Sequence, residues 1–343
     1  MRLAYVDYHT CGEPVRIVTS GYPELDGATI LEKRRQAREH HDGLRCAMML
    51  EPRGHDGMYG VIPVAASHPE AAFGVLFTHN EGYSTMCGHA TIALGRYAIE
   101  HGLVPPVEPV TRFCIEAPCG LLRLACEVEG GKVGAVGFES VPAFVEARDL
   151  AVELPGFGRV VTDIAYGGAY YCILPASRFG LDLFETPVEE IVAAAGALTD
   201  RLRATRAITH PLEPDLGFLY GTIVTDEALP DAESFNLCVF AERQIDRSPT
   251  GSGVTARMAL DHARGAVPAG RSRSFRSITG GAFTGRVVAP AAFPVAGAVT
   301  VAVGGTSHLA GEGSFVIEPD DPLGHGFSLP RRFAEISGAS ARG

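Results

Sequence analysis

Lysine is almost absent from this sequence: Lys33 and Lys132 are the only two lysines among its 29 lysine and arginine residues. A pyridoxal phosphate enzyme needs a lysine for its Schiff base. Lys33 lies in a charged run and Lys132 in a glycine turn, so neither resembles a buried catalytic lysine. The sequence also lacks a GxGxxG motif in a strand–helix unit, an HExxH motif and a Cys/His zinc spacing. We therefore expect no cofactor and no metal.

Long apolar runs and paired cysteines are missing too. No stretch approaches the ~20 apolar residues of a membrane helix, and the start, MRLAYVDYHT, has no basic segment followed by an apolar one. Eight cysteines without a CxxC pair are typical of reduced thiols in a cytoplasm. A formal net charge of -11 disfavours nucleic acid and anionic membranes as partners. We expect a cytoplasmic protein with neither partner.

The chain does contain many short strand-like segments, punctuated by glycine and proline as in curved antiparallel sheets. Its 343 residues, 46% of them hydrophobic, suffice for two domains. Helices are expected near residues 31–41 and 187–203. The expected strands are 16–19, 73–78, 121–127, 170–174, 221–225, 287–289 and 299–303.

Two further helices, expected at 88–101 and 251–264, have the features of copies. Aligning Cys87 with Thr250 also aligns the glycines before and after each helix, and it aligns Ile115 with Ile278, each expected to open a strand. The first helix is apolar on nearly every side, which is typical of a buried helix. Because glycine is common at helix ends, a coincidence of capping is the alternative to a repeat.

The repeat predicts a pseudo-duplicated chain of two α/β domains, each with a curved sheet around one central helix. We expect the first domain to span 1–155 and to regain a C-terminal strand at about 320–343. The second domain would span 156–319, and the cleft would lie between the two.

Cys87 and Thr250 occupy equivalent positions at the N-termini of the two repeated helices. The helix dipole and the unpaired amides there favour a thiolate, so Cys87 is a candidate reactive cysteine, the alternative being an ordinary buried thiol. For Thr250 the alternative is a role in helix capping alone. Because residues i and i+2 of a helix point to different faces, Cys87 and His89 are a poor thiol–imidazole dyad.

The same two helix N-termini are candidate anion sites. The amides of Gly88, His89, Gly251 and Ser252 are predicted to hold one carboxylate between the helices, since glycine lets the backbone approach a ligand.

Longer motifs around these residues resemble those of a known protein superfamily. MCGHAT, from Met86, and DRSPTGSG, from Asp246, strongly resemble the two signature motifs of the proline racemase superfamily. HTCGEPVRIV, EPRGHDGMYG and DPLGHGF support the resemblance, which covers essentially the whole chain. It implies two domains of the diaminopimelate-epimerase-like fold, an imino acid as the small-molecule substrate and a homodimer.

In racemases and epimerases of that superfamily, two cysteines face each other across the substrate α-carbon. Cys87 matches the first, but Thr250 stands where the second is expected. A free thiol has a pKa near 8.5 and an alcohol one near 15.7, a gap of about 7 units or roughly 10 kcal/mol. Thr250 is therefore not expected to act as a base, whereas base chemistry on the Cys87 face is retained.

The resemblance implies roles for four other residues. Asp246 would bind the ring ammonium, the alternative being a structural Asx turn. His89 would hydrogen-bond or protonate a 3-hydroxyl through its imidazole, or serve through its backbone only. Tyr59 and Phe240 would pack around the ring and exclude water, with plain core packing as the alternative.

Three functions remain open. One base at Cα suffices to expel a 3-hydroxyl, and superfamily members with threonine here resemble trans-3-hydroxy-L-proline dehydratases, cofactor-independent hydro-lyases. The second function is a 4-hydroxyproline epimerase or proline racemase with an altered second acid. The third is an imino-acid binder without catalytic activity.

Overall fold

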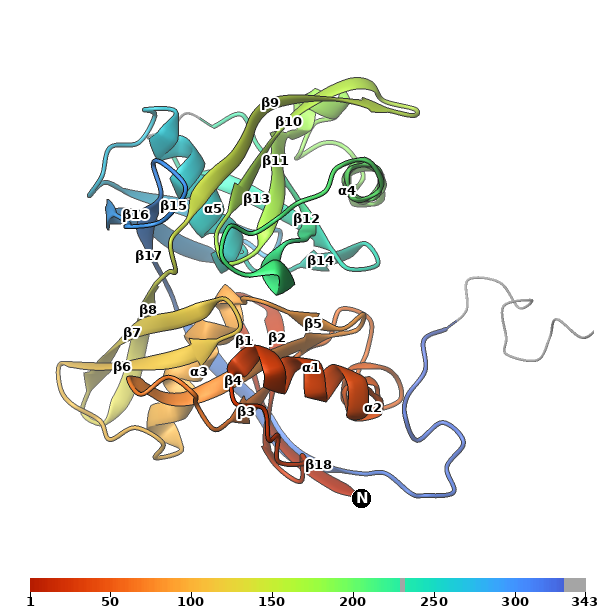
Figure 1. Cartoon of the computed structure of the whole chain (residues 1–343), viewed down its shortest axis with the longest axis vertical. Helices are drawn as coiled ribbons and strands as arrows, with labels where there is room; N and C mark the ends of the chain where they lie inside the picture. Colours follow the sequence, from red (N-terminus) through yellow and green to blue (C-terminus); the bar gives the residue numbers. More distant parts are fainter. Residues whose placement is uncertain (229–231, 330–343) are drawn as a thin grey trace, which may run out of the picture.

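The chain folds into two lobes, one above the other in Figure 1. This computed structural model describes residues 1–228 and 232–329. The lower lobe contains helices α1 to α3, strands β1 to β8 and strand β18, and the upper lobe contains β9 to β17, α4 and α5. The expected α/β fold class, with a curved sheet around a central helix in each half, is confirmed.

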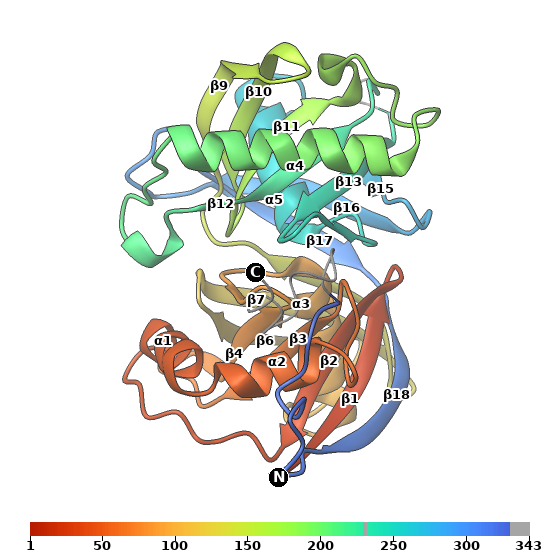
Figure 2. The same cartoon turned by 90° about the vertical axis from the view of Figure 1, so that its right-hand side faces the viewer.

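The lower lobe is built around α3 (Gly88–Glu100), which packs against β1, β2, β7, β8 and β18. Two short helices, α1 (Ile30–His40) and α2 (Asp42–Met49), cover another part of this sheet (Figure 2). Its strands are β1 (Arg2–Thr10), β2 (Glu13–Ser20), β3 (Tyr59–Val64), β4 (Ala71–His79), β5 (Tyr83–Ser84), β6 (Val110–Ala117), β7 (Gly120–Glu129), β8 (Lys132–Glu139) and β18 (Ser307–Val316).

The upper lobe is built around α5 (Gly251–Ala263), which packs against β9, β10, β11, β16 and β17. Helix α4 (Val188–Thr205) lies across its outer face in Figure 2. Its other elements are β9 (Phe144–Leu154), β10 (Gly158–Tyr166), β11 (Tyr170–Pro175), β12 (Leu219–Thr225), β13 (Ser234–Phe240), β14 (Gln244–Asp246), β15 (Ser272–Arg276), β16 (Ala282–Pro290), β17 (Val299–Gly305) and the 3₁₀ turns Ala176–Phe179 and Pro214–Leu216.

The two central helices match the sequence prediction. Both span 13 residues, start at the glycine after the aligned Cys87 or Thr250, and are buried over most of their length. Helices α1 and α4 lie where helices were expected, and every expected strand lies within an observed strand. Helix α2 was not predicted.

The repeat is shorter than the sequence suggested. Neither isoleucine opens a strand as expected: Ile115 is fully buried near the end of β6, whereas Ile278 follows β15 in a turn and is 47% exposed. The prediction failed there because a constant sequence offset cannot reveal that the second copy changes its turn and exposes the aligned apolar residue.

The structure also corrects the elements at the expected domain limits. Strand β9, assigned to the first domain by sequence, pairs with β10 of the upper lobe. The strand that returns to the lower lobe is β18, which pairs with β1 and lies earlier in the chain than the strand expected from about 320. The part of that expected strand at 330–343 lies outside the described residues. We propose domain limits near residues 140 and 306 in place of 155 and 320.

Three smaller expectations concern the lysines, the cysteines and membrane-spanning helices. Lys33 is buried, and its ammonium donates to the Ala65 carbonyl at 2.6 Å. All eight cysteines are free. Among the described residues, none of the helices combines the length and the apolar character needed to cross a bilayer.

Candidate active site

The N-termini of α3 and α5 meet backbone to backbone between the lobes. A Cβ placed on Gly88 would lie 2.4 Å from the Cα of Gly251, and a Cβ on Gly251 would lie 2.6 Å from the Cα of Gly88. No side chain fits at either position, which explains glycine at both. The first residues of both helices therefore lie side by side and line the same cavity, which is the arrangement that the predicted carboxylate site requires.

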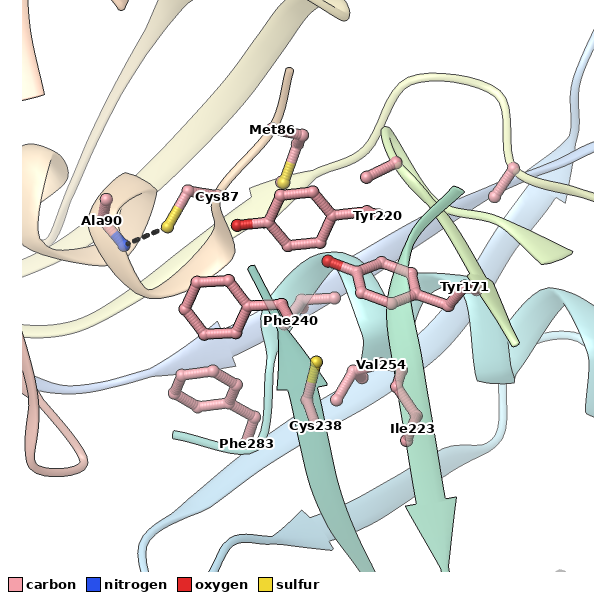
Figure 3. Close-up of a cluster of buried hydrophobic side chains, with 14 of the residues drawn as sticks. Met86, Cys87, Ala90, Tyr171, Tyr220, Ile223, Cys238, Phe240, Val254 and Phe283 are labelled. Atoms are coloured by element: carbon pink, nitrogen blue, oxygen red, sulfur yellow. Dashed lines mark hydrogen bonds between the residues drawn. The ribbon is translucent and has the colours of Figure 1, made fainter. Parts of the chain in front are cut away.

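Cys87 is the N-cap residue of α3 and is buried. Its Sγ accepts a hydrogen bond from the Ala90 amide at 3.4 Å (Figure 3). Burial raises the pKa of the thiol well above its ordinary value, the Ala90 amide lowers it, and the negative charge of Asp246 raises it further. Helix position favours the thiolate as predicted, but desolvation is the larger effect.

His89 lies against the thiol, contrary to the prediction from helix spacing. The Cys87 Sγ is 3.1 Å from the His89 Nδ1. The i and i+2 rule did not apply because Cys87 precedes the first helical turn and has an extended backbone, with φ −145° and ψ 114°. Burial lowers the pKa of His89, and a hydrogen bond to the Pro14 carbonyl raises it. The imidazole is thus neutral and fixed beside the sulfur.

Thr250 is also an N-cap residue, but its geometry differs. Its φ is 64°, in the left-handed region that β-branched residues rarely adopt. Its side chain makes no capping hydrogen bond, and its Oγ1 is buried without a partner among the described residues. Capping alone does not explain this residue. A strained backbone holding an unpaired hydroxyl is typical of a functional site.

Asp246 lies at the end of β14, buried near both N-cap residues. Its Oδ1 accepts from the Ser248 amide at 2.8 Å, so the Asx turn considered as an alternative is present. Its carboxylate also lines the cavity described below, so the turn and a ligand role are compatible. The following residue, Arg247, joins the lobes: its amide donates to the buried Glu13 at 2.7 Å and its guanidinium to the Gly57 carbonyl at 2.9 Å.

Every predicted site residue lines one small cavity, together with four residues that the sequence analysis did not predict. Figure 3 shows several of them around Cys87. The lining residues are Tyr59, Met86, Cys87, Gly88, His89, Tyr171, Tyr220, Cys238, Phe240, Asp246, Thr250, Gly251 and Ser252. Met86, Tyr171, Tyr220 and Cys238 are the additions.

Aromatic rings form part of the cavity wall. Tyr220 is stacked on Phe240, with centroids 5.5 Å apart and planes at 11°. Behind them His79 is fully buried and touches the edges of both rings and the face of Tyr59. Burial and nearby arginines lower the pKa of His79 to about 3, so it is a neutral spacer. The Cys87 thiol that lines the same cavity belongs to a residue that is 5% exposed.

One missed residue had a signal in the sequence. Side chains at i and i+2 of a strand share a face, so placing Phe240 in the site should also have placed Cys238 there. Burial raises the pKa of Cys238, and a contact with Thr250 lowers it. Tyr171 and Tyr220 come from β11 and β12, and no local pattern showed which face of those strands meets the other lobe.

Two polar clusters in the sequence, at residues 40–42 and 55–56, contain residue types that bind metals, but their carboxylates have other partners. Asp42 pairs with Arg45 at 2.6 Å, and Asp56 accepts from Gln244 at 3.0 Å. Within residues 1–228 and 232–329, His, Cys, Asp and Glu form no group of three arranged to hold a metal ion.

The geometry of two helix N-termini facing one buried cavity agrees with the family comparison. A model of the family described as proline racemase matches residues 5–328. The chain belongs to the proline racemase family. Family membership and the observed fold together confirm the resemblance carried by the two signature motifs.

Relatives narrow the comparison further. The chain is 50% identical over 335 residues to the trans-3-hydroxy-L-proline dehydratase of Homo sapiens, covering 95% of this chain and 94% of that protein. It is 42% identical to the 3-hydroxyproline 2-epimerase of Burkholderia multivorans, covering 95% and 97%. The solved structure of a hydroxyproline epimerase from Agrobacterium vitis, with bound trans-4-hydroxy-L-proline, matches with a TM-score of 0.90 at 26% identity, covering 99% of this chain and 98% of that one.

Proposed function

We propose that this protein is a trans-3-hydroxy-L-proline dehydratase, a hydro-lyase that forms Δ1-pyrroline-2-carboxylate and water. One observation carries the proposal: a buried thiol, Cys87, and a buried unpaired hydroxyl, Thr250, line one cavity where two-base members of the superfamily need two thiols. The identity to the human dehydratase, which covers 95% of this chain, supports it.

Cys87 acts as the base in this proposal, with His89 as its partner. In the tautomer whose Nδ1 carries no proton, Nδ1 accepts the thiol proton from the Cys87 Sγ 3.1 Å away. Thiolate and imidazolium then form together. Substrate binding keeps water out, so the pair replaces solvation of the separate charges.

The substrate is oriented by charge. Its carboxylate binds the first-turn amides of α3 and α5, at Gly88, His89, Gly251 and Ser252, where the unpaired N–H groups favour an anion. Its ring ammonium pairs with Asp246, and Tyr59 and Phe240 pack around the ring. Thr250 donates a hydrogen bond to the substrate from the face opposite Cys87.

Elimination then needs one base. Cys87 takes the α-proton, the electrons of that C–H bond form the C2=C3 double bond, and the C3–O bond breaks with protonation of the leaving hydroxyl. The enamine product tautomerises to the cyclic imine. Because the Thr250 hydroxyl is a far weaker acid than a thiol, it does not return a proton to the opposite face of Cα.

Cys238 is the observation that favours the second candidate, a 2-epimerase. This thiol is buried in the same cavity beside Thr250, on the side where an epimerase needs its second acid. The similarity to the Burkholderia 3-hydroxyproline 2-epimerase supports the same alternative.

The proposal includes a cytoplasmic homodimer that needs no cofactor. The cysteine usage and acidic charge support the compartment, and the family resemblance supports the dimer.

Incubation with three substrates tests the function. The purified protein should give an imine, trapped with o-aminobenzaldehyde, from trans-3-hydroxy-L-proline and not from trans-4-hydroxy-L-proline or L-proline. A change of optical rotation with any of the three substrates, without imine from the first, would establish the isomerase instead. No reaction with any of the three would favour the imino-acid binder.

A further inference from the structure

Three tyrosine hydroxyls reach the cavity, and two of them are hydrogen-bonded to serine. Tyr59 bonds to Ser84, and Tyr171 bonds to the Ser252 Oγ at 2.7 Å. The Tyr220 hydroxyl has no hydrogen bond to any group in the described part of the chain, although the residue is only 7% exposed. A hydroxyl of a cavity-lining residue with no protein partner is available to a ligand.

The ring of Tyr220 is held firmly, and its hydroxyl points toward Cys87 in Figure 3. Stacking on Phe240 and an edge contact with Tyr171, with centroids 5.6 Å apart, fix the plane of the ring. The proximity also appears in the electrostatics: burial raises the pKa of Tyr220 most, and charge on Tyr171 and on Cys87 raises it further. The phenol thus stays protonated beside the base.

Stereochemistry decides where an acid is needed, given the proposed function. In trans-3-hydroxy-L-proline the hydroxyl and the carboxylate lie on opposite faces of the ring, so the hydroxyl and the α-hydrogen share one face. The base that removes this hydrogen is Cys87. The departing hydroxyl therefore also faces the Cys87 side of the cavity, away from Thr250.

We propose that Tyr220 is the catalytic acid that protonates the departing 3-hydroxyl. Its hydroxyl lies on the side of the base, has no competing protein partner and is fixed by stacked rings. His89 is less suited, because its two ring nitrogens lie 3.1 Å and 3.7 Å from the Cys87 sulfur and the imidazole also bonds to the Pro14 carbonyl. In solution a phenol, with a pKa near 10, is a stronger acid than water, near 15.7; burial raises the pKa of Tyr220 here and keeps its proton in place until the hydroxyl departs.

The cycle balances without an external acid. Cys87 thiolate takes the α-proton and becomes a thiol, the C2=C3 bond forms, and the C3–O bond breaks while the Tyr220 O–H proton goes to the departing oxygen as water. Tyr220 is left as a phenolate facing the new thiol. The proton passes from Cys87 to Tyr220, which restores both residues for the next turnover.

The test uses a leaving group that needs no proton. Wild type and Tyr220→Phe are compared on trans-3-hydroxy-L-proline and on trans-3-chloro-L-proline, from which chloride departs unprotonated to give the same imine. For Tyr220→Phe we expect kcat on the hydroxy substrate to fall about 10²- to 10³-fold, with KM little changed and chloride elimination retained. Tyr166→Phe, which removes a buried unpaired hydroxyl outside this cavity, is the matched control and should keep both activities.

The other outcomes separate the two proposals. Unchanged dehydration in Tyr220→Phe would overturn the role of Tyr220 and leave the Cys87 thiol as the acid. Equal losses on both substrates would overturn it too, because they would show a packing role. Absence of imine from the hydroxy substrate in the wild type would overturn the proposed dehydratase and, with it, the acid.

Discussion

The N-termini of α3 and α5 are equivalent in the repeat, but they differ in almost every chemical respect. Cys87 has an extended backbone, accepts a capping hydrogen bond from Ala90 and lies beside an imidazole. Thr250 has a left-handed backbone, makes no side-chain cap bond and contacts a second thiol, Cys238. The N-terminus of α3 thus has a thiol beside an imidazole, as a base requires. The N-terminus of α5 has instead a hydroxyl without a hydrogen-bond partner among the described residues.

This difference teaches how a duplicated fold can lose symmetry in its chemistry and keep it in the placement of its two central helices. Gly88 and Gly251 still meet at equivalent positions, so the anion site needs both halves. The residue before each glycine has diverged, from cysteine at 87 to threonine at 250. Strain of about 1–3 kcal/mol for a non-glycine residue at positive φ is tolerated at Thr250 because the surrounding structure fixes it.

The largest effect should come from removing the base. Cys87→Ser exchanges a thiol for an alcohol about 7 pKa units weaker as an acid, and we expect the rate of imine formation to fall at least about 10⁴-fold. Cys114→Ser, at a partly exposed free cysteine in β6, is the control and should keep its activity. Comparable activity in Cys87→Ser would break the proposed asymmetry between the two helix ends.

The backbone contact that the two ends share should be nearly as sensitive. Gly88→Ala places a methyl group 2.4 Å from the Gly251 Cα, so the helices must separate. We expect a loss of about 10²-fold or more in kcat/KM, because a shift of about 1 Å misplaces the reacting groups. Gly82→Ala, where nothing lies within 4 Å of the added carbon, is the control. If Gly88→Ala matched it, the helix contact would not position the site.

The neutral imidazole of His79, which packs against the aromatic rings of the cavity wall, should change how the stability of the protein depends on pH. The pKa of His79 is about 3 in the folded protein, against 6.5 for an ordinary histidine. Between these values the unfolded chain binds a proton that the folded protein does not, so stability falls as the pH falls. From pH 7 to 4.5 this costs about 2–3 kcal/mol. Urea unfolding at both pH values should show a smaller decrease for His79→Phe, and an equal decrease would mean that His79 is protonated in the fold.

The smallest loss should come from the second helix end. Thr250→Val keeps the β-branched shape and removes the hydroxyl, so dehydration should fall no more than about tenfold, the value of one hydrogen bond. Thr250→Cys should instead gain 2-epimerisation, measured by chiral chromatography, because it restores a thiol on that face. If Thr250→Val lost as much dehydratase activity as Cys87→Ser, both helix N-termini would be required for the elimination.

Local sequence patterns predicted the helices and strands well, because glycine boundaries and buried apolar faces are encoded nearby in the chain. They also brought Cys87 and Thr250 together through the repeat. They did not predict two side-chain contacts within the site. The stacking of Tyr220 on Phe240 depends on strand register, and the contact of His89 with Cys87 depends on a backbone bend before the first helical turn. Neither feature has a periodic signature.

The most direct test of one-base chemistry is to run the reaction in D₂O with trans-3-hydroxy-L-proline and follow it by proton NMR. The asymmetry between Cys87 and Thr250 predicts conversion to the pyrroline, with no cis-3-hydroxy-D-proline at any time. Accumulation of α-deuterated cis-3-hydroxy-D-proline would contradict it, because a proton from solvent would then be reaching Cα on the Thr250 face.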